Sequence, residues 1–494
     1  MRRMRKCATC FCFHILLLCL WNSTICGQVS GAASDEGRFL CVSDIHFNPF
    51  QDDALVPRLM QSGVPTWHGI LEKSRERKPS PLGEETNYAL LISTLKRMNK
   101  VCPTPDFILF SGDTLVHEFE KKFGKYSKSQ GELRKFVLKT YEFMSYEFNY
   151  FFPRVPIYFT LGNNDGYDGD YEIPPSGSFL HAGADLFRRY WIKEGSSGSP
   201  GGFEGPGPGP KVLETGGEAA ELGFADTFVK GGNYGVRPVR TRHASLIAIN
   251  SVYFSSRNSY RSQGRQQLEW LEKQLKDARD GDRKVWILMH ILPGIDVRAT
   301  LSHPGQPTVY WDETTRNSRG RTYLQEFKYL MKKYGPTVRG VFSGHSHMDH
   351  FRVVPDADRG RGASAFVHVT PALSPKFRNN AAFQLFRYDR DSMALLDYET
   401  HYYHPQYNEW EKEYDFRQTY RRSVLTPGSL DKVREAMIES GYVRSAFIRF
   451  YDVNNSKDNP ITKTHWKAYW CGIASLTRGE FASCLSGAEL PGSP

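Results

Sequence analysis

The sequence lacks long apolar runs beyond its N-terminus, and it has few cysteines after that point. Five of the nine cysteines lie within the first 26 residues, and only four follow. Hydrophobic residues make up 40% of the chain and charged residues 24%. This composition excludes a wholly disordered chain, and the mean hydropathy of −0.50 excludes a multi-span membrane protein.

The N-terminal residues 1–33 have the layout of a secretory signal peptide. Basic residues at positions 2, 3, 5 and 6 precede an apolar stretch over residues 7–21, and small or polar residues follow. This stretch is shorter than the roughly 20 residues of a membrane-spanning helix, and an uncleaved signal anchor is the alternative. We expect a secreted, lumenal or vacuolar protein that contacts a membrane only through such an anchor.

The charge of the chain is moderately basic. Loss of the four basic residues of the targeting segment would lower the net charge from +10 to +6. No phosphate-binding loop of the G-x-x-x-x-G-K-[ST] type and no nucleic-acid-binding module stands out in the sequence. The charge therefore favours a small or polymeric anionic substrate over a nucleic acid.

Short apolar runs rich in β-branched and aromatic residues end in polar turns and predict strands. They lie at residues 39–42, 107–110, 157–161, 246–249, 285–289, 338–342 and 366–369. Apolar residues at helical spacing, such as Leu268, Leu271 and Leu275, lie between some of them. This alternation predicts a layered α/β core.

Two segments differ from this core in composition. Residues 195–217 are rich in Gly and Pro, which predicts a flexible surface insertion rather than a domain boundary. From about residue 406 aromatic and charged residues dominate, and residues 429–438 have a helical pattern. We expect a C-terminal helical subdomain over residues 406–494.

The cysteines and one sequon predict modifications of a secretory protein. Cys471 and Cys484 lie close together in a short C-terminal stretch and are expected to form a disulfide. Cys41 and Cys102 could also pair, but Cys41 lies in a predicted buried strand, where a free thiol is an equally good interpretation. Asn454 begins an Asn-x-Ser sequon, which predicts a glycosylated surface loop.

Residues of the kind that bind metal ions follow five of the predicted strands directly. In chain order they are Asp44 and His46, Asp113, Asn163, His290, and the pair His345 and His347. Sites in α/β sheets lie at the ends of strands, so we expect these side chains to converge. Each motif is weak alone, but the five together, each in the same strand-then-loop context, predict a metal centre.

These motifs, D-x-H, G-D, G-N-N-D, H and G-H-S-H, resemble those of the calcineurin-like metallophosphoesterase family over residues 38–404. Within that family, residues 290–294, 344–351 and 370–375 with Asn379 and Asn380 are similar to the acid sphingomyelinase-like and endopolyphosphatase branch. The resemblance implies a four-layer α/β core, in which two sheets pack face to face between helices. The catalytic domain would span residues 34–405.

The resemblance also implies a dinuclear site in which Asp113 bridges two divalent ions. Asp44, His46 and His347 would bind one ion. Asn163, His290 and His345 would bind the other. Zinc suits such histidine-rich ligands, with manganese or iron as alternatives. A hydroxide that bridges the two metals would then attack the phosphorus of a phosphoanhydride or phosphodiester.

The sequence departs from the family pattern at Asn164, which replaces a histidine that usually donates a proton to the leaving group. An amide cannot deliver a proton, so this change favours a leaving group that departs without one. A phosphate, whose second pKa is about 6, is such a group. We therefore expect hydrolysis of phosphoanhydrides, in polyphosphate or nucleotides. His117, in the G-D-x-x-x-H pattern of acid sphingomyelinase-like enzymes, is an alternative proton donor and would support hydrolysis of phospholipid or other esters.

Two further expectations concern the rim of the site and a possible loss of catalysis. Lys376 and Arg378 precede Asn379 near the end of the core and are expected to contact a phosphate.

A secreted binding protein that keeps the fold but not the chemistry is the non-enzyme alternative. It is disfavoured because all seven ligand positions carry competent donors.

Overall fold

The computed structural model describes residues 35–193, 223–241, 243–303, 305–356, 362–455 and 457–487. The expected targeting segment 1–33 and the Gly/Pro-rich insertion 195–217 lie outside these described residues. The described residues all belong to one compact unit. Within the described ranges, no helix has both the length and the apolar character needed to cross a membrane.

The core contains two six-stranded sheets, of which the first includes the N-terminal strand β1. Its strand order is β12-β11-β10-β1-β2-β3, and β1, β2 and β3 run parallel while the others pair antiparallel. Its strands are β1 (Glu36–Val42), β2 (Ile108–Phe110), β3 (Ile157–Phe159), β10 (Ala382–Asp389), β11 (Leu395–His404) and β12 (Glu409–Asp415).

The second sheet has the order β4-β5-β6-β7-β9-β8, with four parallel central strands and an antiparallel strand at each edge. Its strands are β4 (Tyr234–Val236), β5 (Ala244–Ala248), β6 (Lys284–Leu288), β7 (Val338–Ser343), β8 (His350–Pro355) and β9 (Ala363–Val369). All seven strands expected from the sequence are present. The charged β12 and the polar and aromatic β11 do not show the same apolar pattern.

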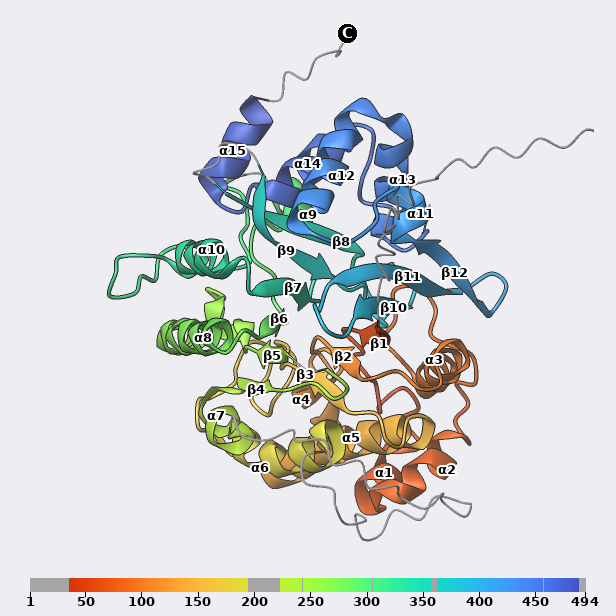
Figure 1. Cartoon of the computed structure of the whole chain (residues 1–494). Coiled ribbons are helices and arrows are strands. Elements are labelled where there is room, and N and C mark those ends of the chain that lie inside the picture. Colours follow the sequence, from red (N-terminus) through yellow and green to blue (C-terminus); the bar gives the residue numbers. More distant parts are fainter. Residues whose placement is uncertain are drawn as a thin grey trace, which may run out of the picture. The chain divides into compact units, whose positions relative to one another are not determined.

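Helices flank both sheets, as Figure 1 shows. They are α1 (Val56–Gln61), α2 (Trp67–Leu71), α3 (Tyr88–Val101), α4 (Phe119–Phe123), α5 (Gln130–Phe151), α6 (Ser178–Phe187), α7 (Phe224–Gly231), α8 (Ser262–Asp280), α9 (Val297–Ser302), α10 (Tyr323–Tyr334), α11 (Phe416–Tyr420), α12 (Pro427–Glu439), α13 (Gly441–Tyr451), α14 (Trp466–Ala474) and α15 (Arg478–Ser486). Shorter helical turns are η1 (Val64–Thr66), η2 (Arg188–Ile192) and η3 (Ser251–Phe254).

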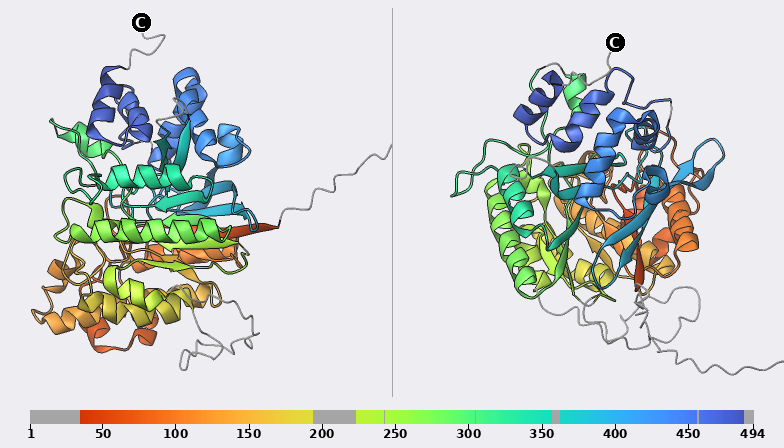
Figure 2. Two further views of the ribbon diagram at one scale, coloured as in Figure 1. Left: turned by 60° about the vertical axis from the view of Figure 1, so that its left-hand side comes forward. Right: turned by 45° about the horizontal axis from the view of Figure 1, so that its top comes forward.

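The two sheets pack face to face through large aromatic side chains. The ring of Phe39 on β1 lies 5.0 Å from that of Trp286 on β6 and 5.8 Å from that of Phe342 on β7. Helices α3 and α5 cover the first sheet, and α8 and α10 cover the second, so that the layers run helix, sheet, sheet, helix (Figure 2). The expected four-layer α/β fold is confirmed.

The C-terminal part continues the first sheet and then becomes helical. Strand β12 pairs with β11, and helices α12 and α14 pack against β9 and β8. A disulfide joins Cys471 on α14 to Cys484 on α15, as expected. Cys41 and Cys102 are buried free thiols. The proposed domain boundary near residue 406 stays a prediction.

The topology brings the carboxyl ends of the parallel strands together. Loops after β1, β2 and β3 carry the expected ligands of the first sheet, and loops after β6 and β7 carry those of the second. Each sheet therefore supplies part of one site at the edge where the sandwich meets solvent.

Candidate active site

The expected ligands lie in tight loops with an unusual backbone. Five of the seven have a positive φ, between 44° and 70°, namely Asp44, His46, Asp113, His345 and His347. This left-handed conformation costs a residue other than glycine about 1–3 kcal/mol and is concentrated at functional sites. The fold thus maintains strained loops where the donors are presented.

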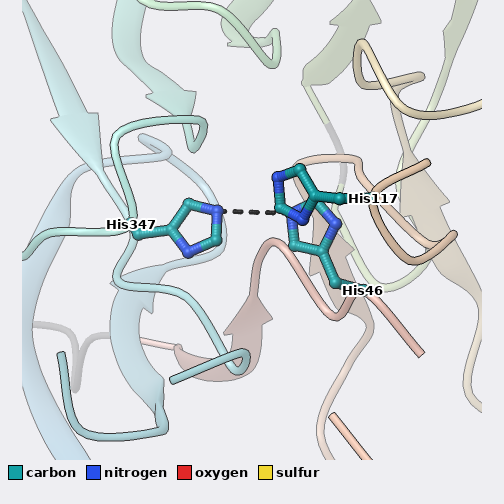
Figure 3. A group of neighbouring side chains, drawn as sticks. All are labelled: His46, His117 and His347. Carbon is teal, nitrogen blue, oxygen red and sulfur yellow. Dashed lines mark hydrogen bonds between the residues drawn. The ribbon is translucent and has the colours of Figure 1, made fainter. Parts of the chain in front are cut away.

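One half of the site gathers side chains from both sheets around His46. His46 Nε2 lies 3.2 Å from His347 Nε2 and 3.4 Å from Asp113 Oδ2. His347 Nε2 also lies 3.5 Å from Asp44 Oδ1. Figure 3 shows His46 and His347 facing each other, with the ring of His117 stacked on His46. These four donors form the group that was expected to bind the first ion.

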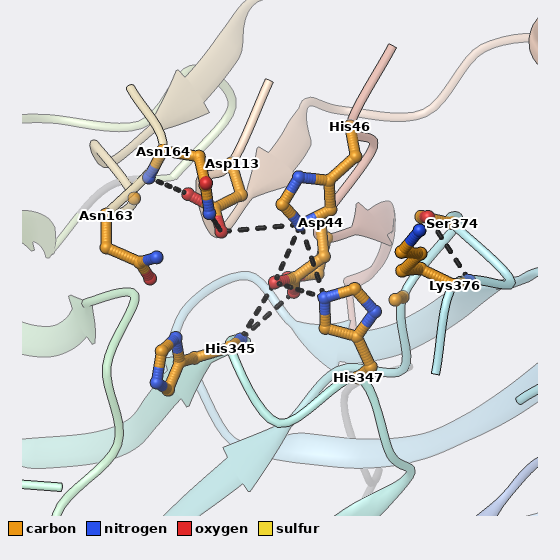
Figure 4. A network of polar contacts seen from close by, with 12 residues as sticks. Asp44, His46, Asp113, Asn163, Asn164, His345, His347, Ser374 and Lys376 are labelled. Atoms are coloured by element: carbon orange, nitrogen blue, oxygen red, sulfur yellow. Dashed lines mark hydrogen bonds and ion pairs between the residues drawn. The ribbon is translucent and has the colours of Figure 1, made fainter. Parts of the chain in front are cut away.

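The other half gathers around His290. His290 Nε2 lies 3.0 Å from Asn163 Oδ1, 3.3 Å from His345 Nδ1 and 3.3 Å from Asp113 Oδ2. Asp113 Oδ2 therefore faces both His46 and His290. In Figure 4 the side chains of Asp44, His46, Asp113 and His347 turn toward one another, with Asn163 and His345 to one side. The structure brings all seven expected ligands together in two adjoining groups.

The donor set fits divalent cations. His46 Nδ1 lies 2.9 Å from the carbonyl oxygen of Leu115, so that nitrogen carries the proton and Nε2 presents a lone pair. Burial, together with His117, lowers the pKa of His46 to about 4, which keeps the ring neutral. Two acceptors, His46 Nε2 and Asp113 Oδ2, thus face each other without a proton between them. A cation would satisfy both.

The environment of His290 also favours a positive charge between His290 and Asp113. Burial lowers its pKa, but the Asp113 carboxylate outweighs this and raises the pKa of His290 to about 9. Its Nδ1 lies 2.7 Å from the carbonyl oxygen of Ser111, which fixes the ring with Nε2 toward Asp113. A divalent ion would take the place of the Nε2 proton.

Asp113 is oriented by its neighbours in the G-N-N-D loop. Asn164 donates its backbone N–H to Asp113 Oδ1 at 2.8 Å and its side-chain amide to Oδ2 at 2.9 Å. The buried Asp165 carboxylate accepts the backbone N–H groups of Gly162, Asp113 and Thr114. Asp165 therefore ties the loop after β3 to the loop after β2.

Glu85 is a site residue that the sequence did not suggest. Its Oε1 lies 2.9 Å from His117 Nδ1 and 3.7 Å from Lys376 Nζ, and its Oε2 accepts a hydrogen bond from Ser374. Burial lowers the pKa of His117, but Glu85 reverses this effect and raises it overall. Glu85 lies in an irregular segment before α3, without a motif that would have marked it.

The two residues that were expected to contact a phosphate, Lys376 and Arg378, have different surroundings. Lys376 lies beside Glu85 at the site, whereas the Arg378 guanidinium forms an ion pair with Asp458 at 2.7 Å. Between them, the 40%-exposed ring of Phe377 contacts His347, with ring centroids 4.5 Å apart. Phe377 is a second residue that sequence motifs did not mark.

The sequon residue Asn454 lies away from the site and is partly buried. Its side-chain amide donates to the Tyr402 hydroxyl at 3.1 Å, and its carbonyl oxygen accepts from Arg449. Ser456 lies outside the described residues, and glycosylation at Asn454 stays a prediction.

The chain is similar to several known proteins. The family model described as calcineurin-like phosphoesterase matches residues 37–349. The chain is 24% identical to sphingomyelinase phosphodiesterase D of Dictyostelium discoideum, over 90% of this chain and 94% of that protein. It is 25% identical to acid sphingomyelinase-like phosphodiesterase 3b of Homo sapiens, over 86% and 84% of the two chains.

The chain is also similar to a second human protein and to a solved structure. The chain is 23% identical to the human cyclic GMP-AMP phosphodiesterase SMPDL3A, over 91% of this chain and 90% of that protein. Among solved structures, a dimetal phosphatase from Danio rerio matches with a TM-score of 0.38 and 10% identity. That match covers 79% of this chain and 99% of the other.

Proposed function

Because this chain belongs to the calcineurin-like phosphoesterase family and is a metal-dependent hydrolase of phosphoric esters or anhydrides, we propose that phosphoanhydrides are its preferred substrates. Polyphosphate and nucleoside polyphosphates are the substrate classes. The observation that carries the proposal is the bonding of Asn164, whose side-chain amide donates to Asp113 and is too weak an acid to protonate a leaving group.

The metal ions belong to the two groups of donors described above. One ion would be held by Asp44, His46 and His347. The other would be held by Asn163, His290 and His345, and Asp113 would contact both ions. Zinc suits these ligands, with manganese or iron as alternatives. When bound, two such ions supply positive charge to the phosphoryl oxygens and lower the pKa of water.

The side chains of the chain itself orient the reacting groups. Asn164 fixes the Asp113 carboxylate through two hydrogen bonds, and Asp165 fixes the loops on either side. A phosphate leaving group departs without a proton donor, because its second pKa is about 6. An alkoxide lacks this advantage, and a general acid is typically worth about 10²- to 10⁴-fold in rate for such a group.

A second candidate, hydrolysis of phosphodiesters, is supported by His117. The ring stacks on His46 with centroids 4.0 Å apart, and Glu85 holds its Nδ1. The other nitrogen, Nε2, would then be the one that donates a proton to an alcohol leaving group. This arrangement keeps an acid in the site despite the loss of the histidine at position 164.

We further propose that the protein functions in the secretory pathway, secreted or within a lumen or vacuole. The Cys471–Cys484 disulfide supports an oxidising compartment, and residues 1–33 would supply the signal peptide or anchor. The non-catalytic binding protein is not favoured, because the seven donors converge as a metal-dependent hydrolase requires.

A substrate panel on purified protein tests the proposal. Rates on inorganic polyphosphate, a nucleoside triphosphate, sphingomyelin and an alkyl phosphodiester would be measured together with the metal content of the same sample. We expect the anhydrides to be cleaved much faster than the alkyl ester, and Asp113→Ala to lose both metal and activity. Equal turnover of the ester and the anhydrides would contradict the preference for anhydrides.

A further inference from the structure

Arg257 is an exposed cation that the fold fixes beside the His290 half of the site. It lies in the loop after η3, and its side chain is 63% exposed. Its Nη2 donates to Asp170 Oδ2 at 2.8 Å, and its guanidinium carbon lies 4.1 Å from the centre of the Tyr171 ring. The guanidinium is thus held by an ion pair at one edge and by an aromatic ring against its face.

Both neighbours of Arg257 contact expected metal ligands. Asp170 Oδ1 accepts a hydrogen bond from Asn163 Nδ2 at 2.7 Å. The Tyr171 hydroxyl lies 3.4 Å from His345 Nε2. Asp170 therefore lies between the guanidinium and Asn163, and Tyr171 lies between the guanidinium and His345. The positive charge of Arg257 is thus placed at the rim of the site.

The ion pair with Asp170 orients Arg257 more than it stabilises the protein. Exposed pairs of this kind contribute about 0–1 kcal/mol. A guanidinium has five N–H donors in a planar fork, and one carboxylate oxygen uses few of them. The other donors match the geometry of a phosphate, which arginine binds through two parallel hydrogen bonds.

Through Asp170, Arg257 is linked to the loop that carries Asn163 and Asn164. Its partner Asp170 lines the same cavity as Asn164, which stands where the family has its proton donor. Lys376 lies beyond His46 and His347, on the side away from Asn163 (Figure 4). The two cations thus flank the site from opposite edges.

We propose that Arg257 is a specificity-determining residue that binds the phosphate of the leaving group, next to the phosphorus that is attacked. The inference rests on the proposed function, because only a diphosphate or a longer chain has a second phosphate at this position. Arg257 thereby selects such substrates over esters whose leaving groups are neutral or cationic.

The test compares Arg257→Ala and Arg257→Lys with wild type and with a control, in full-length protein at one fixed concentration of free metal. The control is Arg189→Ala, because Arg189 is 59% exposed and pairs with Asp185 away from the site. The substrates are inorganic triphosphate and bis(p-nitrophenyl) phosphate, which has no second phosphate.

We expect Arg257→Ala to raise the KM for triphosphate about tenfold, the loss expected for a charge-assisted contact. The kinetic constants for the diester should stay within about twofold of wild type. Arg257→Lys should restore part of the loss, and Arg189→Ala should change nothing. Equal losses on both substrates, or an unchanged KM for triphosphate, would overturn the inference.

Inhibition by inorganic diphosphate separates this inference from the proposed function. If wild type cleaves the diester but not triphosphate, the proposed function fails, yet competitive inhibition of diester cleavage still reports on Arg257. A tenfold higher inhibition constant in Arg257→Ala supports the contact, and an unchanged constant refutes it. Calorimetric titration of diphosphate into the same variants gives this comparison without turnover.

Discussion

Asn164 donates two hydrogen bonds to Asp113, one from its backbone N–H to Oδ1 and one from its side-chain amide to Oδ2. Oδ2 is the oxygen that also faces His46 and His290. The residue that replaces the usual proton donor thus supports the carboxylate that is expected to bridge the two ions. Its contribution to catalysis is expected to be the orientation of a ligand.

We therefore expect Asn164→Ala to affect the binding of metal ions more directly than the rate of hydrolysis. The variant keeps the backbone hydrogen bond to Oδ1 but loses the one to Oδ2. Loss of a hydrogen bond that orients a ligand typically weakens metal affinity about 10- to 100-fold. Titration of metal into chelator-treated protein measures this effect. An affinity equal to that of wild type would show that the amide does not orient Asp113.

Gly162→Ala should remove metal and activity together. A Cβ at this position would overlap the Asp113 carboxylate and its backbone nitrogen, so Asp113 would have to move. Gly428→Ala is the matched control, because an added Cβ there meets nothing within 4 Å. Metal content and kcat/KM of the two variants give the answer, and a fully metallated, active Gly162→Ala protein would contradict the placement of Asp113.

Glu85→Gln should change the pH dependence of ester hydrolysis. Burial lowers the pKa of His117, whereas Glu85 raises it and prevails. Without the carboxylate the pKa of His117 falls, and the protonated ring is lost at a lower pH. The basic limb of the pH profile for an alkyl phosphodiester should therefore shift toward acid. The profile for triphosphate, which needs no proton donor, should not move, and parallel shifts for both substrates would argue against His117 as the acid.

His68 provides a pH-dependent contribution to stability outside the site. It lies 2.9 Å from Glu147 through Nδ1 and 3.3 Å from Glu72 through Nε2, and the hydrogen bond to Glu147 raises its pKa. The charged ring stabilises the fold fully below its unfolded pKa of about 6.5. This stability is lost as the pH rises through the higher folded value.

His68→Gln should therefore lower the free energy of unfolding by about 1 kcal/mol at pH 5.5 and by less at pH 9. Urea unfolding at the two pH values measures the difference. His181→Gln is the control, because His181 is an exposed residue of α6. A loss that is equal at both pH values would exclude protonation as its source.

The convergence of the seven expected ligands could be predicted because each follows a strand with a clear pattern. The last four residues of β1 (39–42) are apolar and buried, and Asp44 and His46 follow within four residues. Glu85 and Arg257 could not be predicted in the same way. They reach the site through contacts across about 30 to 90 residues of sequence, with His117 and Asp170 respectively, and no local motif records such contacts.

Strand β12 shows the corresponding limit for the fold. Its sequence EWEKEYD is mostly charged, and only Tyr414 is fully buried. Edge strands often carry charges that discourage pairing with other molecules, and this removes the apolar alternation by which strands are recognised. The central strands, enclosed on both faces, keep short uninterrupted apolar runs.

The division of the ligands between two sheets affects when the protein becomes active. Asp44, His46 and Asn163 come from the first sheet, and His290, His345 and His347 come from the second. Neither sheet alone offers a complete set for either ion. An ion would therefore bind tightly only after the sandwich has closed, and it would then favour the closed form by mass action. Hydrolytic activity would be acquired only once the two sheets have packed together, so that a half-folded chain carries no working site.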